Sequence, residues 1–201
     1  MLAPGVTLFH VRHGETDWNV EARLQGRTDT AMNARGLAQA GRNGRALAIH
    51  LRDAGIDPAA LRWVASPLGR ARLTMEIVRT AVGLPAAGYD VDERLLEIAF
   101  GEWSGRTIPE LVAAGEKDRV AARRRDKWGF TPPGGESYAD LAARIVPFLG
   151  ELGADTVAVS HGGVYRVIHG LVVGIPKHDI PVLAARQDAV AVFRDGAMRW
   201  L

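Results

Sequence analysis

The hydrophobic pattern of the chain alternates between short apolar runs and longer segments with helical periodicity. Apolar runs of the length of a buried strand lie at 6–11, 61–66 and 156–161. Strands that alternate with helices in this way are typical of α/β proteins whose sheet is largely parallel. The pattern therefore predicts a three-layer α/β/α sandwich with a mostly parallel central sheet.

Capping residues indicate where the helices begin and end. Asn33 is expected to cap a helix that continues to about residue 53. Ser66 and Pro67, as N-cap and first helical residue, predict a helix that ends at Gly83. Ser137 begins a capping box for a helix to about residue 152.

The end of the chain predicts one more helix and a hairpin. A helical pattern begins at about residue 162, where the third apolar run ends. The segment 189–201 contains the pair Asp195-Gly196, which is typical of a tight turn between two antiparallel strands.

The segment from about 97 to 136 differs from the rest of the chain. A capping box at Thr107 predicts a short helix, and the basic stretch that follows it ends in two prolines and two glycines. We expect a lid inserted into a single domain that spans 1–201. The run Arg123-Arg124-Arg125 in this lid is interpreted as a solvated group of charges, with substrate contact as the alternative.

Composition narrows the class of protein. The 201 residues are 47% hydrophobic and 24% charged, which is ordinary for a globular protein, and a net charge of +2 does not indicate a nucleic-acid partner. The sequence has no cysteine, which excludes disulfides, thiolate zinc sites and a thiol-based phosphatase. No signal peptide or membrane span is recognised, so we expect a cytoplasmic protein without a membrane partner. The sequence is compatible with a monomer or a homo-oligomer.

Polar side chains follow the ends of the three predicted strands. Arg12 and His13 follow the first, Arg70 lies in the helix after the second, and His161 with Gly162 follows the third. A lone Arg-His pair is usually a solvated strand end. In open α/β sheets, however, ligands bind beyond the carboxyl ends of the strands, so we expect these side chains to converge.

The chemistry that suits this set is phosphoryl transfer. Arginine forks, N–H groups at a helix N-terminus and a further histidine can together bind a phosphate dianion. A neutral imidazole can attack phosphorus and carry the phosphoryl group covalently. Nearby positive charge favours that neutral form because it lowers the pKa of the imidazole.

Several motifs, in order along the chain, resemble those of the histidine phosphatase superfamily, which is also called phosphoglycerate mutase-like. The motifs are VRHGETDWN (11–19), RLQGRTD (23–29), SPLGRARLT (66–74), LLEIAFGEWSG (95–105), PGGESYADL (133–141) and VSHGGVYR (159–166). The resemblance implies the α/β/α fold and an enzyme that acts on a small phosphorylated metabolite through a phosphohistidine. It implies no metal and no cofactor.

The resemblance also implies a role for particular residues. His13 becomes the phosphorylated nucleophile, and Glu97 becomes the proton donor that later activates water. The phosphate pocket and the loop that lines the substrate would be formed by Arg12, Asn19, Arg23, Gln25, Arg70, His161 and Gly162. The residues interpreted as helix caps rather than site residues are Asn33, Ser66, Ser137 and Asp140. Those interpreted as packing or surface histidines are His10, His50, His169 and His178.

The branch of the family is indicated by the segment FGEWSGRTI (100–108). Cofactor-dependent mutases have a tyrosine and a lysine where this chain has Phe100 and Ile108, which favours a phosphatase. The basic run at 123–125 favours the alternative, because mutases place an arginine pair for a substrate carboxylate at about this point. A phosphomonoester hydrolase is therefore the prediction. A phosphoglycerate mutase and a non-catalytic phospho-ligand binding protein are the alternatives.

Overall fold

The computed structural model describes residues 2–201 and contains one six-stranded sheet with the order β3-β2-β4-β1-β5-β6. The first four strands in that order are parallel, whereas β5 and β6 form an antiparallel hairpin beside β1. This confirms the predicted mostly parallel sheet and the hairpin. The strands are β1 (Leu8–Arg12), β2 (Arg62–Ala65), β3 (Asp90–Val91), β4 (Thr156–Ser160), β5 (Val190–Arg194) and β6 (Ala197–Trp200).

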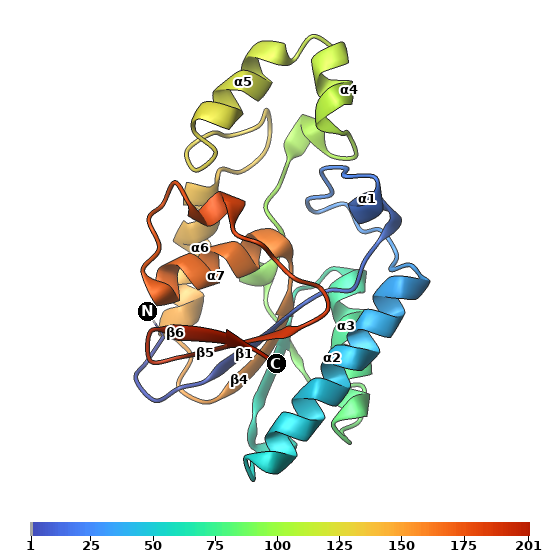
Figure 1. The fold of residues 1–201 in the computed structure, drawn as a ribbon, viewed down its shortest axis with the longest axis vertical. Coiled ribbons are helices and arrows are strands. Elements are labelled where there is room, and N and C mark those ends of the chain that lie inside the picture. The colour runs from blue at the N-terminus through green and yellow to red at the C-terminus, as the bar shows by residue number, and fades with distance from the viewer. Residues whose placement is uncertain (1) are drawn as a thin grey trace.

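Helices cover both faces of the sheet, as the three-layer prediction requires. Figure 1 shows α2 and α3 on one side of the strands and α6 and α7 on the other. The helices are α1 (Asp17–Val20), α2 (Ala34–Asp53), α3 (Gly69–Ala81), α4 (Ile108–Ala113), α5 (Lys117–Arg125), α6 (Tyr138–Gly150) and α7 (Gly162–Val173).

Side chains along the central strands alternate between the two faces of the sheet, so the core consists of two layers. In β1, Leu8 packs in the apolar cluster that includes Phe148 of α6 and Ile168 of α7. Its neighbour Phe9 packs in the cluster that includes Leu47 of α2. Successive side chains of a strand point to opposite faces, so one short apolar run supplies both layers. A continuous apolar run is thus what a strand at the centre of this sheet needs.

The first strand of the chain lies in the middle of the sheet. Leu8 is paired with Thr156 of β4 on one side and with Phe193 of β5 on the other. Because β1 and β4 are parallel and in register, Arg12 lies opposite Ser160. The residues that follow these two strands therefore begin at the same edge of the sheet.

The predicted caps are correct except at Ser66. Asn33 accepts a hydrogen bond from the Gly36 N–H, and both Ser137 and Thr107 begin complete capping boxes. The helix after β2, however, begins at Gly69, and its N-cap residue has no capping side chain. The Asp29 carboxylate accepts from the Gly69 N–H at 2.7 Å instead. The prediction for Ser66 was wrong because its hydroxyl is hydrogen-bonded to His161.

The segment 97–136 lies beyond the carboxyl ends of the strands, where Figure 1 shows α4 and α5 above the sheet. It has an apolar cluster of its own, made of Trp103, Leu111 and Val120. Phe130 stacks on Trp103 with ring centroids 5.4 Å apart. Among residues 2–201, no helix is long and apolar enough to cross a membrane.

Candidate active site

The ends of β1 and β4 bring two histidines together. The His13 N–H donates to the Ser160 carbonyl at 2.9 Å, which continues the β1–β4 pairing by one residue. His161 is the N-cap residue of α7, directly after β4. The two imidazole rings lie 5.1 Å apart between centroids. Parallel pairing in register therefore places side chains 148 positions apart in the sequence at one point.

The ring of His13 is fixed in one orientation. Its Nδ1 lies 2.8 Å from the Gly14 carbonyl, which can only accept, so Nδ1 carries the proton. The lone pair is then on Nε2, which lies 3.3 Å from the Nε of Arg70. Burial, followed by the charges of Arg70 and Arg12, holds the pKa of His13 well below its usual value of 6.5. At neutral pH this imidazole is uncharged and its Nε2 can act as a nucleophile.

Arg70 is held by the loop that contains the motif RLQGRTD (23–29). Its two terminal nitrogens donate to the carbonyls of Thr28 and Gly26 at 2.7 and 2.8 Å. Asp29 completes this loop and lies 3.5 Å from the same guanidinium. Because both ends of the fork are fixed, the guanidinium plane has little freedom to rotate. The side chain is fully buried, so the loop sets where its charge lies.

Arg12 and His161 each keep a buried nitrogen without a protein partner. Arg12 donates from one terminal nitrogen to the Ala185 carbonyl at 2.7 Å, and His161 Nε2 lies 2.7 Å from the Ser66 hydroxyl. Within residues 2–201, Arg12 Nε and His161 Nδ1 have no hydrogen-bond partner. Burial lowers the pKa of Arg12 to about 10, so it stays charged at neutral pH. Unpaired buried donors are costly, and an anion would supply the missing acceptors.

Ser66 also determines which protons His161 can offer. Burial, followed by the nearby His13 and Arg70, holds the pKa of His161 well below its usual value, so the ring is neutral. If the Ser66 hydroxyl donates to Nε2, the ring proton lies on Nδ1, the nitrogen that has no partner. His161 can then donate a hydrogen bond to an anion without carrying a charge itself.

Glu97 lies at the N-terminus of α7. Both of its carboxylate oxygens accept from the Gly163 N–H at 3.0 Å, and one of them accepts from the Ile98 N–H at 2.9 Å. A Cβ at position 163 would come within 2.3 Å of the carboxylate, so only glycine allows this approach. Burial lowers the pKa values of Arg12 and Arg70, and the negative charge of Glu97 raises them, which favours the charged form of both arginines.

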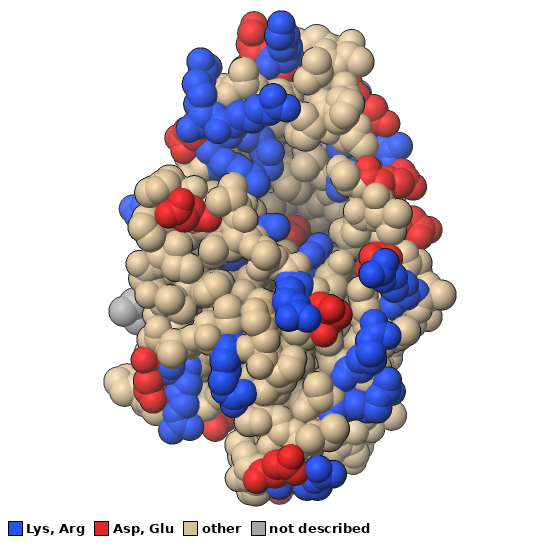
Figure 2. Space-filling model, in the orientation of Figure 1, with Lys and Arg blue, Asp and Glu red and all other residues tan. Residues whose placement is uncertain are grey.

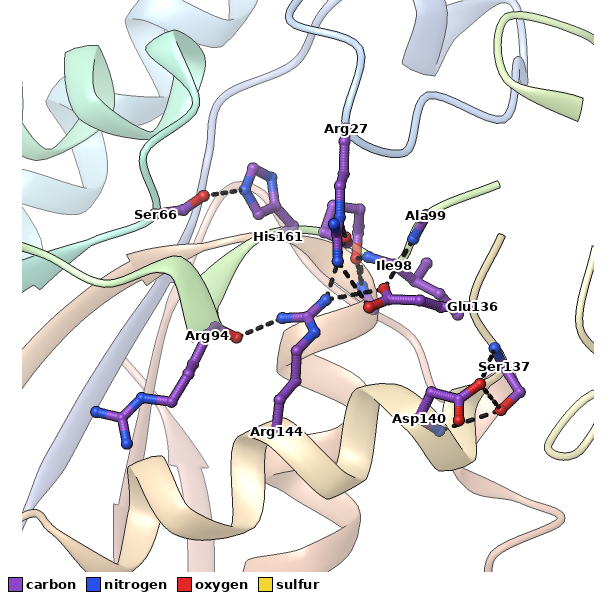
Figure 3. A network of polar contacts seen from close by, with 12 residues as sticks. Arg27, Ser66, Arg94, Ile98, Ala99, Glu136, Ser137, Asp140, Arg144 and His161 are labelled. Atoms are coloured by element: carbon purple, nitrogen blue, oxygen red, sulfur yellow. Dashed lines mark hydrogen bonds and ion pairs between the residues drawn. The ribbon is translucent and has the colours of Figure 1, made fainter. Parts of the chain in front are cut away.

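Two arginines hold the backbone of Glu97 in place. Arg27 and Arg144 donate to its carbonyl oxygen at 3.4 and 3.2 Å. Glu136 bridges these arginines, with ion pairs of 2.6 and 3.2 Å, and also accepts from the Ala99 N–H (Figure 3). Arg27 lies between the two residues whose carbonyls hold Arg70. One loop therefore positions both Arg70 and the backbone of Glu97.

Three of the predicted site residues take part in holding the loop together. Asn19 lies 3.4 Å from the buried Gln25 and 3.1 Å from the side chain of Gln187. Gln25 also hydrogen-bonds to Thr30. Arg23 points toward the lid, where it pairs with Glu110 at 2.8 Å and with the Gly105 carbonyl. Their assignment as substrate-lining residues stays a prediction.

The segment between α7 and β5 makes two contacts to the site that the sequence did not indicate. Gln187 donates to the His13 carbonyl at 3.0 Å and so braces the loop that carries His13. Ala185 supplies the carbonyl that holds Arg12. This segment has no motif and acts partly through its backbone, so no residue pattern could have indicated it. Ser66 was visible in the sequence, but its position before a proline favoured a helix cap.

Three buried neutral histidines make the fold sensitive to acid. Burial lowers the pKa of His10 to about 3 and holds those of His13 and His161 well below 6.5. As the pH falls through 6.5, the unfolded chain therefore binds at least three protons that the folded protein does not, and His50 and His169, whose pKa burial also lowers, add to this difference. The stabilisation that comes from the neutral histidines is fully present above about pH 7. Below that pH we expect the free energy of unfolding to fall, by about 4 kcal/mol per pH unit near pH 5.5.

Urea unfolding followed between pH 8 and pH 5 measures this loss. Most carboxylates titrate at lower pH, so a change in the free energy of unfolding between pH 8 and pH 5 reports mainly on the histidines. The variant His178→Ala is the matched control, because the His178 side chain is 81% exposed and should not change the slope. A free energy of unfolding that is constant between pH 7 and pH 5 would contradict the expectation.

The site as a whole combines a neutral imidazole, two guanidinium groups, a second histidine and a carboxylate. Among the described residues, no three histidine, aspartate or glutamate side chains group as metal ligands. An open α/β sheet that presents this set at its carboxyl edge defines an enzyme of the phosphoryl-transfer class. The family within that class follows from comparison with known proteins.

The chain belongs to the histidine phosphatase superfamily, branch 1, whose family model matches residues 8–200. It is 33% identical over 194 residues to a glucosyl-3-phosphoglycerate phosphatase of Mycolicibacterium vanbaalenii, covering 90% of this chain and 80% of that protein. It is 31% identical over 199 residues to a probable phosphoglycerate mutase of Erwinia tasmaniensis, covering 96% and 87%. The crystal structure of an α-ribazole phosphatase from Shigella flexneri superposes with a TM-score of 0.78, at 26% identity over 93% and 89% of the chains.

Proposed function

We propose that the protein is a phosphomonoester hydrolase that acts on a small phosphorylated metabolite through a phosphohistidine. The observation that carries the proposal is the state of His13: its Nδ1 proton is bound to Gly14, and its Nε2 faces the Nε of Arg70 in a buried, positively charged pocket. A scaffold that only binds phosphate would not need a neutral imidazole held with its lone pair toward the anion.

In the first step, Nε2 of His13 attacks phosphorus and the bond from phosphorus to the ester oxygen breaks. Glu97, which takes up a proton as the phosphate dianion binds, gives that proton to the departing oxygen, and the free alcohol leaves. Arg12, Arg70 and the Nδ1 proton of His161 bind the phosphoryl oxygens as charge develops on them. The Gly14 carbonyl accepts from Nδ1 throughout and so stabilises the positive charge of the phosphorylated ring.

In the second step, water replaces the alcohol. The Glu97 carboxylate takes a proton from water as the water oxygen attacks phosphorus. The bond between Nε2 and phosphorus breaks, phosphate leaves, and both His13 and Glu97 return to their starting states. Glu97 is suited to both roles because Gly163 and Ile98 hold it beside Arg12 and Arg70.

Hydrolysis, rather than mutase chemistry, is supported by the phosphatase relatives and by the sequence of the lid. The similar proteins include a phosphatase and a probable phosphoglycerate mutase, so the test measures both activities in the same experiment. The purified protein would be incubated with a panel of phosphorylated metabolites, and phosphate release and interconversion of 3- and 2-phosphoglycerate measured in parallel. Release without interconversion is expected, and the converse would favour the mutase.

The same panel tests whether a metal is needed. Activity is expected to survive excess EDTA, because the arginines supply the positive charge at the phosphate. Metal independence is thus part of the proposal, supported by the two guanidinium groups of the pocket, and a cytoplasmic location is proposed with it.

Arg70→Lys should be severely impaired although it keeps the charge. Lysine cannot reproduce a fork whose two ends are held by Gly26 and Thr28 while Nε faces His13. We expect a loss of transition-state stabilisation of ~2–4 kcal/mol, as for removal of an oriented oxyanion donor. The measurement is kcat/KM with a phosphate monoester, and near-normal kinetics would place Arg70 outside the reacting groups.

A further inference from the structure

The peptide bond that carries the Gly14 carbonyl is held from its other side by Gln39 of α2. Its N–H, which belongs to Glu15, donates to the Gln39 side-chain oxygen at 2.8 Å. In a trans peptide the C=O and N–H groups point in opposite directions. The hydrogen bond at the N–H therefore fixes the direction of the carbonyl, which lies 2.8 Å from Nδ1 of His13.

The preceding peptide bond is held in the same way by two other elements. The His13 carbonyl accepts from Gln187 at 3.0 Å, and the Gly14 N–H donates to the Thr74 hydroxyl of α3 at 3.3 Å. Residues 13–15 belong to no helix or strand, so their backbone groups need such partners from outside the loop. Side chains from α2, α3 and the segment before β5 thus fix two successive peptide planes at the nucleophile.

The first turn of α2 reaches this loop because two glycines meet there. A Cβ on Gly36 would overlap the Glu15 carbonyl oxygen, and a Cβ on Gly14 would overlap the carbonyl oxygen of Gly36. A larger residue at either position would therefore push the helix away from the loop. Gln39 follows Gly36 by three positions, so both residues lie on the same side of α2. The contact between the glycines brings the amide of Gln39 within reach of the Glu15 N–H.

Gln39 and Thr74 lie beneath the surface of the molecule. Gln39 is 4% exposed, and Thr74 is completely buried. Figure 2 shows a hollow on one face, between the lid and the part formed by the sheet and its helices. A substrate that enters such a hollow contacts the side chains at its surface, and these two side chains are not among them. Any influence of Gln39 on the reaction therefore passes through the peptide bond between Gly14 and Glu15.

The direction of the Gly14 carbonyl matters because a neutral histidine can carry its proton on either ring nitrogen. The hydrogen bond made by one nitrogen decides which of them it is. In the free protein, Arg70 Nε lies 3.3 Å from Nε2 of His13 and favours the lone pair there. A bound phosphate dianion is an acceptor instead, and an acceptor beside Nε2 favours the proton on that nitrogen. The Gly14 carbonyl then opposes the effect of the phosphate, because it holds the proton on Nδ1.

We propose that Gln39 is a positioning residue for the nucleophile: it turns the Gly14 carbonyl toward Nδ1 and so keeps Nε2 of His13 free of a proton for attack on phosphorus. The inference rests on the proposed function and adds to it a residue that does not touch the substrate. Among the described residues, no hydrogen bond joins Gln39 to a phosphate-binding side chain. Its loss should therefore slow the chemical step and leave phosphate binding unchanged.

The variant Gln39→Leu removes the acceptor and keeps a side chain of similar size. The maximal rate of phosphoenzyme formation, measured by rapid quench with a phosphate monoester, is expected to fall about 10- to 100-fold, as for one buried donor left unpaired. The Kd for inorganic phosphate should change less than about twofold. Gln39→Glu should restore most of the rate, because a carboxylate oxygen accepts from the same N–H. Gln39→Met, whose sulfur is only a weak acceptor, is a second way to remove the contact and should resemble Gln39→Leu.

The tautomer of His13 gives a readout that a loss of stability would not change. Long-range ¹H–¹⁵N spectra, assigned with His13→Ala, should show the proton on Nδ1 in the wild type and in Gln39→Glu, and partly on Nε2 in Gln39→Leu. Leu47→Ala is the matched control, since it opens a cavity in the core beneath the same helix and should keep both the rate and the tautomer.

A wild-type rate and tautomer in Gln39→Leu, or an equal loss of rate in Leu47→Ala, would overturn the role of Gln39 and leave the proposed function standing. If the wild type forms no phosphoenzyme with any ester, the proposed function itself is refuted, and the positioning role with it.

Discussion

Replacement of His13 by alanine is expected to abolish both turnover and covalent labelling of the protein by a phosphate ester. The Nε2 of His13 carries a lone pair beside Arg70, because Nδ1 holds the ring proton, whereas the Nε2 of His161 is engaged by the Ser66 hydroxyl. Loss of a covalent nucleophile costs on the order of 10⁶-fold in kcat when nothing replaces it. Release of phosphate under steady-state conditions and acid-labile labelling after rapid quench are the two measurements.

The variant should remain folded, which circular dichroism and urea unfolding can establish. His13 lies in a loop after β1, and its backbone contacts to Ser160 and Gln187 do not depend on its side chain. The control is His178→Ala, which removes an exposed histidine and should be fully active. Substantial turnover in folded His13→Ala would assign the nucleophile to another residue.

Replacement of Glu97 by glutamine should slow the reaction in a way that depends on the leaving group. An alkoxide leaves poorly without a proton, whereas p-nitrophenolate leaves readily. Formation of the phosphoenzyme should therefore fall ~100- to 10,000-fold with an alkyl phosphate, and far less with p-nitrophenyl phosphate. With the aryl ester, attack of water then becomes slow, since the same carboxylate is the base. Rapid quench should show that phosphoenzyme accumulates in this variant.

Glu102→Gln is the matched control, because Glu102 is an exposed carboxylate five positions along the same segment. It should behave like the wild type with both esters. If Glu97→Gln slows phosphorylation equally with alkyl and aryl esters and no phosphoenzyme accumulates, Glu97 positions the substrate and a different group is the acid.

The elements and the central residues of the site could be predicted because each has a local signal. Strands at the centre of the sheet are continuous apolar runs, and Asn33, Thr107 and Ser137 are caps whose partners lie three residues away. Arg12, His13 and His161 directly follow such runs, so the rule that ligands bind at the carboxyl edge of a parallel sheet was enough to bring them together.

The remaining contacts could not be predicted because their partners are far apart in the sequence or lie on the backbone. Ser66 was assigned from its neighbour Pro67, but its hydroxyl bonds to a ring 95 positions away. Asp29 caps α3 from 40 positions away, which no capping pattern describes. Gln187 and the carbonyl of Ala185 act on residues 174 and 173 positions earlier. Such contacts follow from the packing of elements rather than from local preference.

The central position of β1 also bears on how the protein is made. Leu8 to Val11 pair with β4 and β5, which end at Ser160 and Arg194, so both sheet partners of β1 are complete only after 182 further residues (194 − 12) have been synthesised. At 5–20 residues per second, this apolar strand waits roughly 10 to 40 s during synthesis. The loop that carries His13 waits for a similar time, because Gln187, which braces it, lies 174 positions later in the chain. During that time β1 presents unpaired apolar backbone edges, and the His13 loop is braced only once Gln187 has been synthesised.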